Sequence, residues 1–257
     1  MRHIKTIISG GALALFASIA CGLFGINGNI AHAADCTISG ADVAQITIIQ
    51  NDPTLSYFEE IQQELALRKK LVGQTIACAD QDVQSLQTTL KGVSVDDHSQ
   101  VLQSQFLGKL SDATNYYAIE LTKLNSSGIA GTQAIAKEIL DWRKNSFVPL
   151  TEQISNFILW TKNQPLFDTA QTRIDQTSRA VTFLESASSN TDLQTAFNAS
   201  LASFNTAQSQ NAAAKASLSQ ISSADESLSL IKESLDSLST TYQDFSKVST
   251  IIKKIIP

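Results

Sequence analysis

An uninterrupted run of 91 residues, from Leu166 to Ile256, contains neither glycine nor proline. These two residues weaken helices more than any others, and they mark most turns. The run is also rich in Ala, Gln, Leu and Lys, which favour helix. This feature restricts the C-terminal third of the chain to long helices, and the apolar spacing after Asp35 indicates helix elsewhere. We therefore predict an all-α fold.

The clearest periodicity lies near the C-terminus, where apolar side chains recur mostly at alternating intervals of three and four residues. This stripe consists of Leu228, Ile231, Leu235, Leu238, Tyr242, Phe245 and Ile252. Such intervals bring the side chains to one face of a helix and are typical of coiled coils. We expect Leu235 and Leu238 to lie in a buried seam and Ser237 to lie outside it.

Another apolar stripe precedes this one, in a predicted helix from Thr191 to about Ile221. Residues 189–257 form either a helical hairpin or one long helix from Thr191 to Lys254. The hairpin is preferred, because folding the two segments together buries both apolar faces. The predicted architecture is an elongated antiparallel helical bundle with coiled-coil-like C-terminal helices.

Helices are also expected in the first two thirds of the chain. The predicted helices run from Pro53 to Lys91 with Asp52 as the cap, from Asp96 or Asp97 to about Leu124, and onward from Thr132 as a cap. The heptad series of the first of these helices begins at Phe58. The segment Ala41–Gln50 fits a short helix or a strand equally well.

Two prolines interrupt the third predicted helix. Pro149 and Pro165 should each kink or restart it, since a proline removes a backbone hydrogen bond and clashes with the preceding turn. Residues 34–188 are therefore predicted to form a helical bundle region with a kinked, aromatic-rich segment. Residues 189–257 are expected to pack on that region.

Residues 1–33 have the pattern of a secretory signal peptide. A basic start with Arg2 and Lys5 precedes an apolar stretch, and Ala31 and Ala33 supply the small residues of a cleavage site. An alternative is a lipid anchor at Cys21, because the residues before it resemble a bacterial lipoprotein box. Either reading predicts an exported protein, secreted or held in the periplasm or cell envelope of a bacterium.

Two cysteines, Cys36 and Cys78, remain after the predicted cleavage. In an oxidising compartment an even pair is most simply one disulfide, which would tie the new N-terminus to the first long helix. The alternative is two unpaired thiols buried as small apolar groups.

The charge balance argues against nucleic acid as a partner. The whole chain carries a net charge of −5, which falls to −7 when Arg2 and Lys5 leave. Binding to phosphates requires several clustered cations, and the sequence has only short basic runs. After processing, no segment approaches the roughly 20 apolar residues of a transmembrane helix.

Candidate catalytic or metal-binding residues are few. His98 is the one histidine after residue 33, and Asp96 and Asp97 precede it. Carboxylates at this place are typical of a helix N-terminus, and a zinc site requires further ligands. The sequence also contains no nucleophile elbow and no phosphate-binding loop. We expect no catalytic residue, no cofactor and no metal, and so no enzyme.

Acidic residues also cluster near the start of the first long helix. Glu60 and Glu64 share a helix face, as a general acid and base would. The preferred interpretation is a solvated face, with Arg68 paired four residues after Glu64.

Aromatic residues concentrate between the two tryptophans and just beyond them. These residues are Trp142, Phe147, Phe157, Trp160 and Phe167. They form either an interaction surface for a sugar or peptide, because flat rings stack on apolar faces, or part of the helical core.

The sequence thus favours an exported, non-enzymatic helical protein that acts as a structural or protein-binding module, of scaffold or adhesin type. The expected partner is a protein or another component of the cell envelope. Two alternatives remain. One is a membrane-active bundle of the pore-forming kind, and the other is a ligand-binding bundle that uses the region from Trp142 to Phe167.

Overall fold

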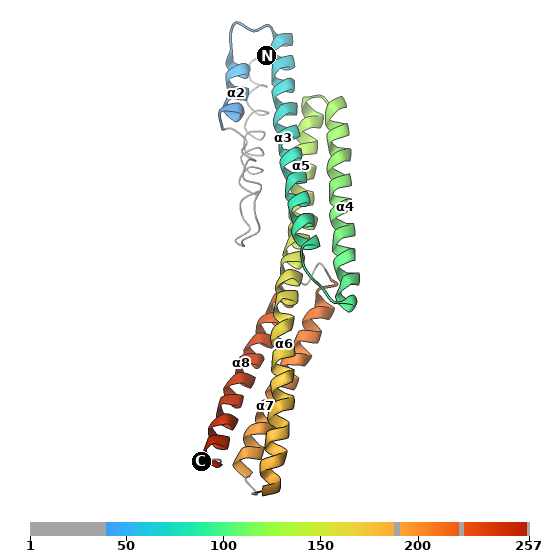
Figure 1. Cartoon of the computed structure of the whole chain (residues 1–257). Coiled ribbons are helices and arrows are strands. Elements are labelled where there is room, and N and C mark those ends of the chain that lie inside the picture. Colours follow the sequence, from blue (N-terminus) through green and yellow to red (C-terminus); the bar gives the residue numbers. More distant parts are fainter. Residues whose placement is uncertain (1–39, 188–190, 221–223, 256–257) are drawn as a thin grey trace. The chain divides into compact units, whose positions relative to one another are not determined.

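The computed structural model describes residues 40–187, 191–220 and 224–255 (Figure 1), apart from the side chains of His98 and Ala187. The elements are α2 (Gly40–Asn51), α3 (Tyr57–Lys91), α4 (Asp97–Ser126), α5 (Ile129–Trp142), the π-helical turn η1 (Arg143–Phe147), α6 (Val148–Ala187), α7 (Thr191–Ser217) and α8 (Ala224–Ile255). No strand occurs in these ranges. The predicted all-α fold is confirmed, and Ala41–Gln50 lies in a helix.

The helices form two compact units. The first contains α2 to α5 and η1, and the second contains α6, α7 and α8, with the boundary between Val148 and Pro149. The prediction from the sequence placed the residues of α6 in the bundle region 34–188, together with the N-terminal helices. This helix belongs instead with α7 and α8, because its buried side chains Phe167, Ala170 and Ile174 pack against theirs.

In the first unit, α3 packs antiparallel to α4, with α5 beside them and α2 along the beginning of α3 (Figure 1). Lys69 Nζ donates to the carbonyl of Asn125, and Gln103 Nε2 donates to that of Leu90, which fixes this antiparallel register. The core side chains include Ile46, Ile49, Leu71, Val72, Ile76, Ala79, Val83, Leu86, Leu90, Phe106, Leu110, Tyr117 and Ile139.

The start of α3 differs from the prediction. Asp52 caps no helix and instead accepts hydrogen bonds from the backbone and hydroxyl of Thr54. The helix begins after Ser56, whose hydroxyl accepts from the N–H of Glu59, while the Glu59 carboxylate accepts from the N–H of Ser56. This capping box satisfies two backbone donors and outcompetes a start at Pro53.

Of the next two predicted helix starts, one is confirmed and the other is wrong. Asp96 caps α4 through the N–H of Ser99, as predicted. The predicted cap at Thr132 is wrong, because α5 begins at Ile129 after Gly128. The Thr132 hydroxyl lies inside the helix and donates to the carbonyl of Gly128.

Both prolines lie in continuous helix. Pro149 follows η1, where the N–H of Val148 reaches back five residues to the carbonyl of Arg143. Pro165 lies inside α6, so a restart there is wrong. Packing explains the continuity, since Trp160 and Phe167 on either side of Pro165 are buried.

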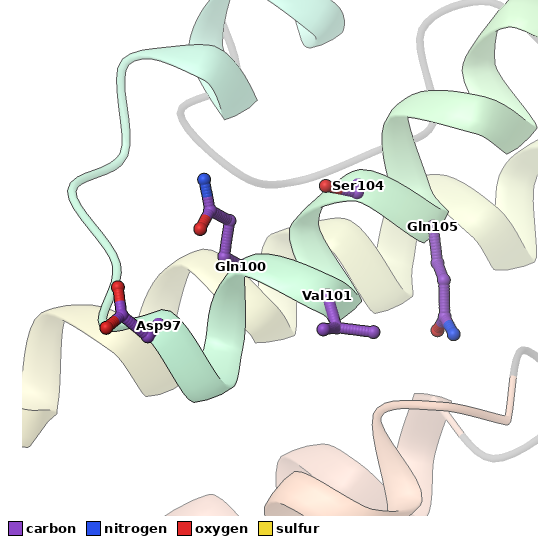
Figure 2. Close-up of a pocket in the computed structure, with 5 residues that line it drawn as sticks. All are labelled: Asp97, Gln100, Val101, Ser104 and Gln105. Atoms are coloured by element: carbon purple, nitrogen blue, oxygen red, sulfur yellow. The ribbon is translucent and has the colours of Figure 1, made fainter.

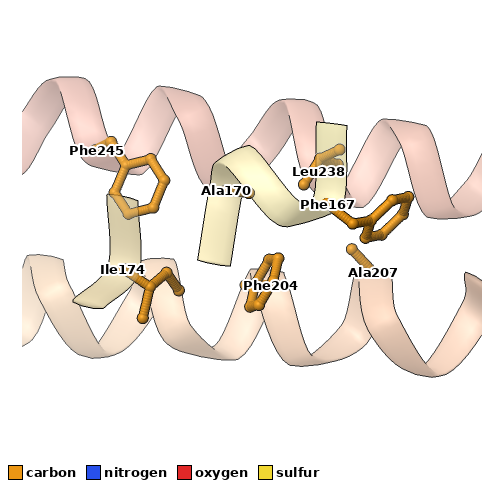
Figure 3. Close-up of a cluster of buried hydrophobic side chains, with 7 residues drawn as sticks. All are labelled: Phe167, Ala170, Ile174, Phe204, Ala207, Leu238 and Phe245. Carbon is orange, nitrogen blue, oxygen red and sulfur yellow. The ribbon is translucent and has the colours of Figure 1, made fainter. Parts of the chain in front are cut away.

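The second unit is a three-helix bundle. Phe167, Ala170 and Ile174 from α6 meet Phe204 and Ala207 from α7 and Leu238 and Phe245 from α8 (Figure 3). A second cluster follows along the bundle, formed by Val181, Leu184, Leu193, Phe197 and Val248. The two last helices form a hairpin rather than one rod, and their hydroxyls meet where Ser227 donates to Ser217.

The buried seam of α8 differs from the predicted one. Leu238 is buried, but Leu235 is only half-buried, and Ser237 is half-buried with its hydroxyl bonded to Gln210. One heptad series in the seam is Ala224, Ile231, Leu238 and Phe245, and the other is Ser227, Ser234, Thr241 and Val248. The small second series lets α7 approach α8 closely.

Candidate functional site

The aromatic residues singled out in the sequence lie in two different units. Trp142 and Phe147 belong to the first, whereas Phe157, Trp160 and Phe167 belong to the second. All except the half-buried Trp142 are buried. An interaction surface built from them is therefore wrong, and the alternative of a helical core holds for the four buried rings.

Trp142 lies at the centre of a cluster at the end of α5. Its ring stacks on Tyr116 of α4 with centroids 4.2 Å apart, meets Tyr117 edge to face at 5.4 Å, and lies parallel to Phe147 at 6.1 Å. Aromatic pairs at these separations contribute beyond their buried area. The cluster fastens α5 and η1 onto α4.

A buried guanidinium completes this cluster. Arg143, the first residue of η1, donates from Nη1 to the Tyr117 hydroxyl at 3.0 Å and from Nη2 to the Asp82 carboxylate at 3.1 Å. Its Cζ lies 5.0 Å from the centroid of the Phe147 ring. Arg143 is thus a buried residue of the π-helical turn, an irregularity that is frequent at functional sites.

Burial changes the acidity of both tyrosines. Removal from water raises the pKa of Tyr117 to about 12, although the Arg143 charge opposes that shift. Burial also raises the pKa of Tyr116, and the negative charges of Glu120 and Glu138 add to the effect. Both phenols therefore stay protonated and act as hydrogen-bonding groups near neutral pH.

The acidic cluster at the start of α3 is not the solvated face that the sequence suggested. Glu64 and Arg68 are buried, with Arg68 only 1 % exposed. Arg68 Nε donates to Glu64 Oε1 at 2.6 Å, and Gln50 of α2 donates to the same oxygen. The pair is buried because α2 covers this side of α3.

Glu120 is the other buried acid of the first unit. The next residue, Leu121, is 42 % exposed although it is apolar, whereas Glu120 is buried. Glu120 Oε1 accepts from Lys123 Nζ at 2.7 Å, and Oε2 has no hydrogen-bond partner in the part of the chain that the structure describes.

Among the described residues of the first unit, the most exposed aromatic side chains lie where α3 begins. Tyr57 is 71 % exposed and Phe58 is 66 % exposed, and we call this pair the aromatic tip. The prediction that Phe58 belongs to the apolar stripe of α3 is wrong. The first turns of α3 extend past the ends of α4 and α5, and among the described helices α2 alone lies beside them (Figure 1).

The aromatic tip is held in a defined position. The capping box of Ser56 and Glu59 fixes the first turn of α3, and the turn of Asp52 and Thr54 fixes the preceding loop. These hydrogen bonds lower the pKa of Asp52 and of Glu59, so both carboxylates stay charged near neutral pH. Sequence reasoning missed the site, although the motif Ser-x-x-Glu signalled the helix start.

Other candidates from the sequence do not form a site. Asp97 lies by a shallow open depression on α4 with Gln100, Val101, Ser104 and Gln105, and these side chains point in different directions (Figure 2). The described residues contain no group of three or more acidic, histidine or cysteine side chains that could hold a metal ion.

The cysteine and signal-peptide predictions concern residues that are mostly outside the described ranges. Cys78 is half-buried on α3, whereas Cys36 and Cys21 precede residue 40, as does the predicted signal peptide. The disulfide therefore stays a prediction. Among the described helices, none is long and apolar enough to cross a bilayer.

Comparison with protein-family models, curated proteins and solved structures finds no match to this chain.

Proposed function

We propose that this protein is an exported, non-enzymatic binding module and that the aromatic tip, Tyr57 and Phe58, engages a protein partner. The exposure of both rings on a rigid helix start is the observation that carries this proposal. Aromatic side chains dominate the binding energy of many interfaces, and rigid anchors lose little entropy when they bind.

The surrounding charge indicates the kind of partner. Glu59 and Glu60 directly follow the aromatic tip in the chain, and Asp52 precedes it by five residues; hydrogen bonds hold Asp52 and Glu59 ionised. These carboxylates would be repelled by an anionic membrane surface. They complement a protein that presents an apolar pocket with a basic rim.

Export rests on the sequence of residues 1–33. Cleavage after Ala33 predicts a mature chain that begins at Ala34 with one disulfide between Cys36 and Cys78. Terminal sequencing and non-reducing mass spectrometry of the exported protein measure both features. A lipidated N-terminus at Cys21 would contradict the cleavage, and two free thiols would contradict the disulfide.

Site-specific photocrosslinking in the producing cell tests the binding surface. A photoreactive amino acid replaces Phe58 in one variant and Val101 in another, because Val101 is 64 % exposed and lies in the same unit. We expect a protein adduct from position 58 that is absent from position 101. Equal adducts from both positions, or adducts with lipid alone, would contradict the proposal.

A further inference from the structure

Partly exposed apolar side chains of α6 and α8 lie beside the line along which these two helices of the second unit meet. The two helices are parallel, as Asn156 of α6 donates to the carbonyl of Ala224 and Arg173 lies over the ring of Tyr242. These contacts fix their register at an offset of about 68 residues. This offset identifies which residues of each helix lie beside the contact between α6 and α8 on its solvent side.

Most of the flanking positions are apolar, and the exception on α6 is Arg173, which lies over the Tyr242 ring. On α6 they include Leu159, which is 39 % exposed, and Leu166, which is 46 % exposed. On α8 they are the half-buried Leu228, Leu235 and Tyr242, each seven residues from the next. Charged residues usually occupy such positions when a helical bundle is complete.

A depression lies between the two helices toward their C-terminal ends. This depression, of about 350 Å³, is lined by Gln176, Thr177 and Ala180 of α6 and by Phe245, Val248, Ser249, Ile252 and Lys253 of α8. Phe183, 72 % exposed, follows Ala180 on α6. The half-exposed leucines and this depression form one surface, which we call the α6–α8 groove.

The charges at the two ends of α8 identify what fits this groove. The first turn of α8 carries Asp225 and Glu226, and the last turn carries Lys253 and Lys254. Asp225 and Lys253 are 28 residues apart, which is four heptads, so they lie on the same side of the helix. A second α8 that runs antiparallel would bring each acidic end onto a basic end.

We propose that the α6–α8 groove is covered by the same groove of a second copy of this chain, related by twofold symmetry. In this arrangement the axis passes near Ser239, midway between Asp225 and Lys253, and the small side chain permits close approach there. The same patch is used twice, so each complementary charge contact occurs twice.

The groove is large enough for a stable dimer. Between Asp225 and Lys253, α8 is about 40 Å long, and two adjacent helices are about 20 Å wide. A face of these dimensions matches the ~800 Å² that each partner buries in a standard interface.

Sedimentation equilibrium of the purified full chain measures the self-association. We expect a dimer for the unchanged protein and at least a tenfold weaker association for Leu166→Lys, which places two buried charges in the symmetric interface. Val101→Lys, an exposed substitution on α4, is the matched control and should leave the association constant unchanged. Circular dichroism verifies that each variant is folded.

A charge exchange tests the antiparallel arrangement separately. Lys253→Glu with Lys254→Glu should weaken the dimer, and adding Asp225→Lys with Glu226→Lys in the same chain should restore it. A chain that stays monomeric up to high concentration would overturn the proposal. A dimer that Leu166→Lys leaves intact, or that the combined charge exchange leaves weakened, would also overturn it.

Discussion

Arg143 joins three segments of the first unit through one guanidinium group. It pairs with Asp82 of α3, donates to Tyr117 of α4 and lies over Phe147 of its own π-helical turn. Removing a guanidinium from water is unfavourable, and only a full set of partners offsets the penalty. Removing one partner of such a pair is costly, because the other polar groups stay buried without it.

Truncating Arg143 should destabilise the first unit strongly. Arg143→Ala leaves the Asp82 carboxylate and the Tyr117 hydroxyl without their partner. We expect the free energy of unfolding to fall by about 2–4 kcal/mol, which is less than for a fully buried pair because Asp82 is partly exposed. Urea unfolding followed by circular dichroism measures it. Lys144→Ala, at the exposed neighbouring position, should change stability by less than about 0.5 kcal/mol. Equal losses would show that Arg143 is not bound as described.

Stability should also fall at alkaline pH through Tyr117. Its folded pKa of about 12 lies above the unfolded value near 10, so the folded state holds the proton more tightly. The resulting stabilisation is complete below pH 10 and disappears as the pH rises toward 12. Tyr117→Phe should remove this part of the pH dependence. Ionisation followed by ultraviolet absorbance should show Tyr117 among the last of the four tyrosines to titrate. If Tyr117 titrated at the same pH as the exposed Tyr57, the burial of Tyr117 would be contradicted.

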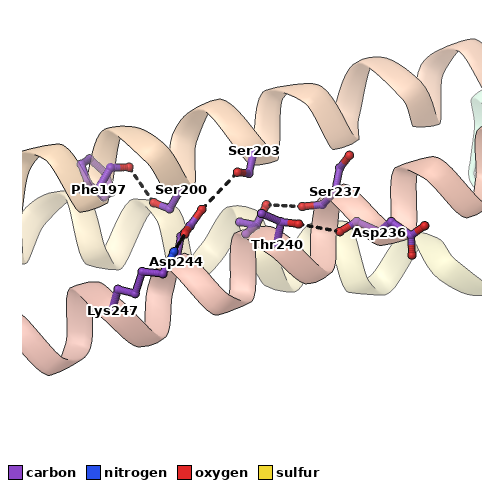
Figure 4. A network of polar contacts seen from close by, with 9 residues as sticks. Phe197, Ser200, Ser203, Asp236, Ser237, Thr240, Asp244 and Lys247 are labelled. Carbon is purple, nitrogen blue, oxygen red and sulfur yellow. Dashed lines mark hydrogen bonds and ion pairs between the residues drawn. The ribbon is translucent and has the colours of Figure 1, made fainter.

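At the scale of the helix, α8 has a seam in which small hydroxyl side chains alternate with large apolar ones. Ser234 is buried and its hydroxyl donates to the carbonyl of Ile231, so it is satisfied without a partner on another helix. Along the edge of the same seam, Ser203 of α7 and Lys247 both donate to the Asp244 carboxylate (Figure 4). These polar contacts specify how α7 and α8 align.

Leu238 and Leu235 should differ in their contribution to stability. Leu238→Ala leaves a cavity among Phe167, Phe204 and Phe245, and we expect a loss of about 2–4 kcal/mol. Leu235 is half-buried, so Leu235→Ala should lose about 1 kcal/mol in dilute, monomeric protein. Gln243→Ala, on the exposed side of α8, is the control. Equal losses at the two leucines would restore the register predicted from the sequence.

Periodicity predicted the helices but not which side chains each helix buries. On α4, Leu102, Phe106, Leu110 and Tyr117 recur at helical spacing, and all four are buried. One turn later the same spacing would bury Leu121, but Glu120 is buried instead. Phe58 was misplaced for a different reason, since burial requires a neighbouring helix and the pattern cannot show where α4 ends.

At the scale of the whole molecule, the chain consists of two helical units with different surfaces. The first presents the aromatic tip on an extended helix start, and the second presents an apolar groove between two parallel helices. We assign partner binding to the former and self-association to the latter. Either assignment can fail without the other, because the two surfaces share no residue.

Affinity for the partner captured at position 58 tests the central claim most directly. Titration calorimetry compares the unchanged chain with Tyr57→Ala, Phe58→Ala and Val101→Ala. If the aromatic tip anchors the interface, Phe58→Ala should weaken binding about thirtyfold, as the loss of a hot-spot residue does, and Tyr57→Ala should weaken it to a similar or smaller degree. Val101→Ala should stay within twofold. Unchanged affinity in both tip variants would contradict the account.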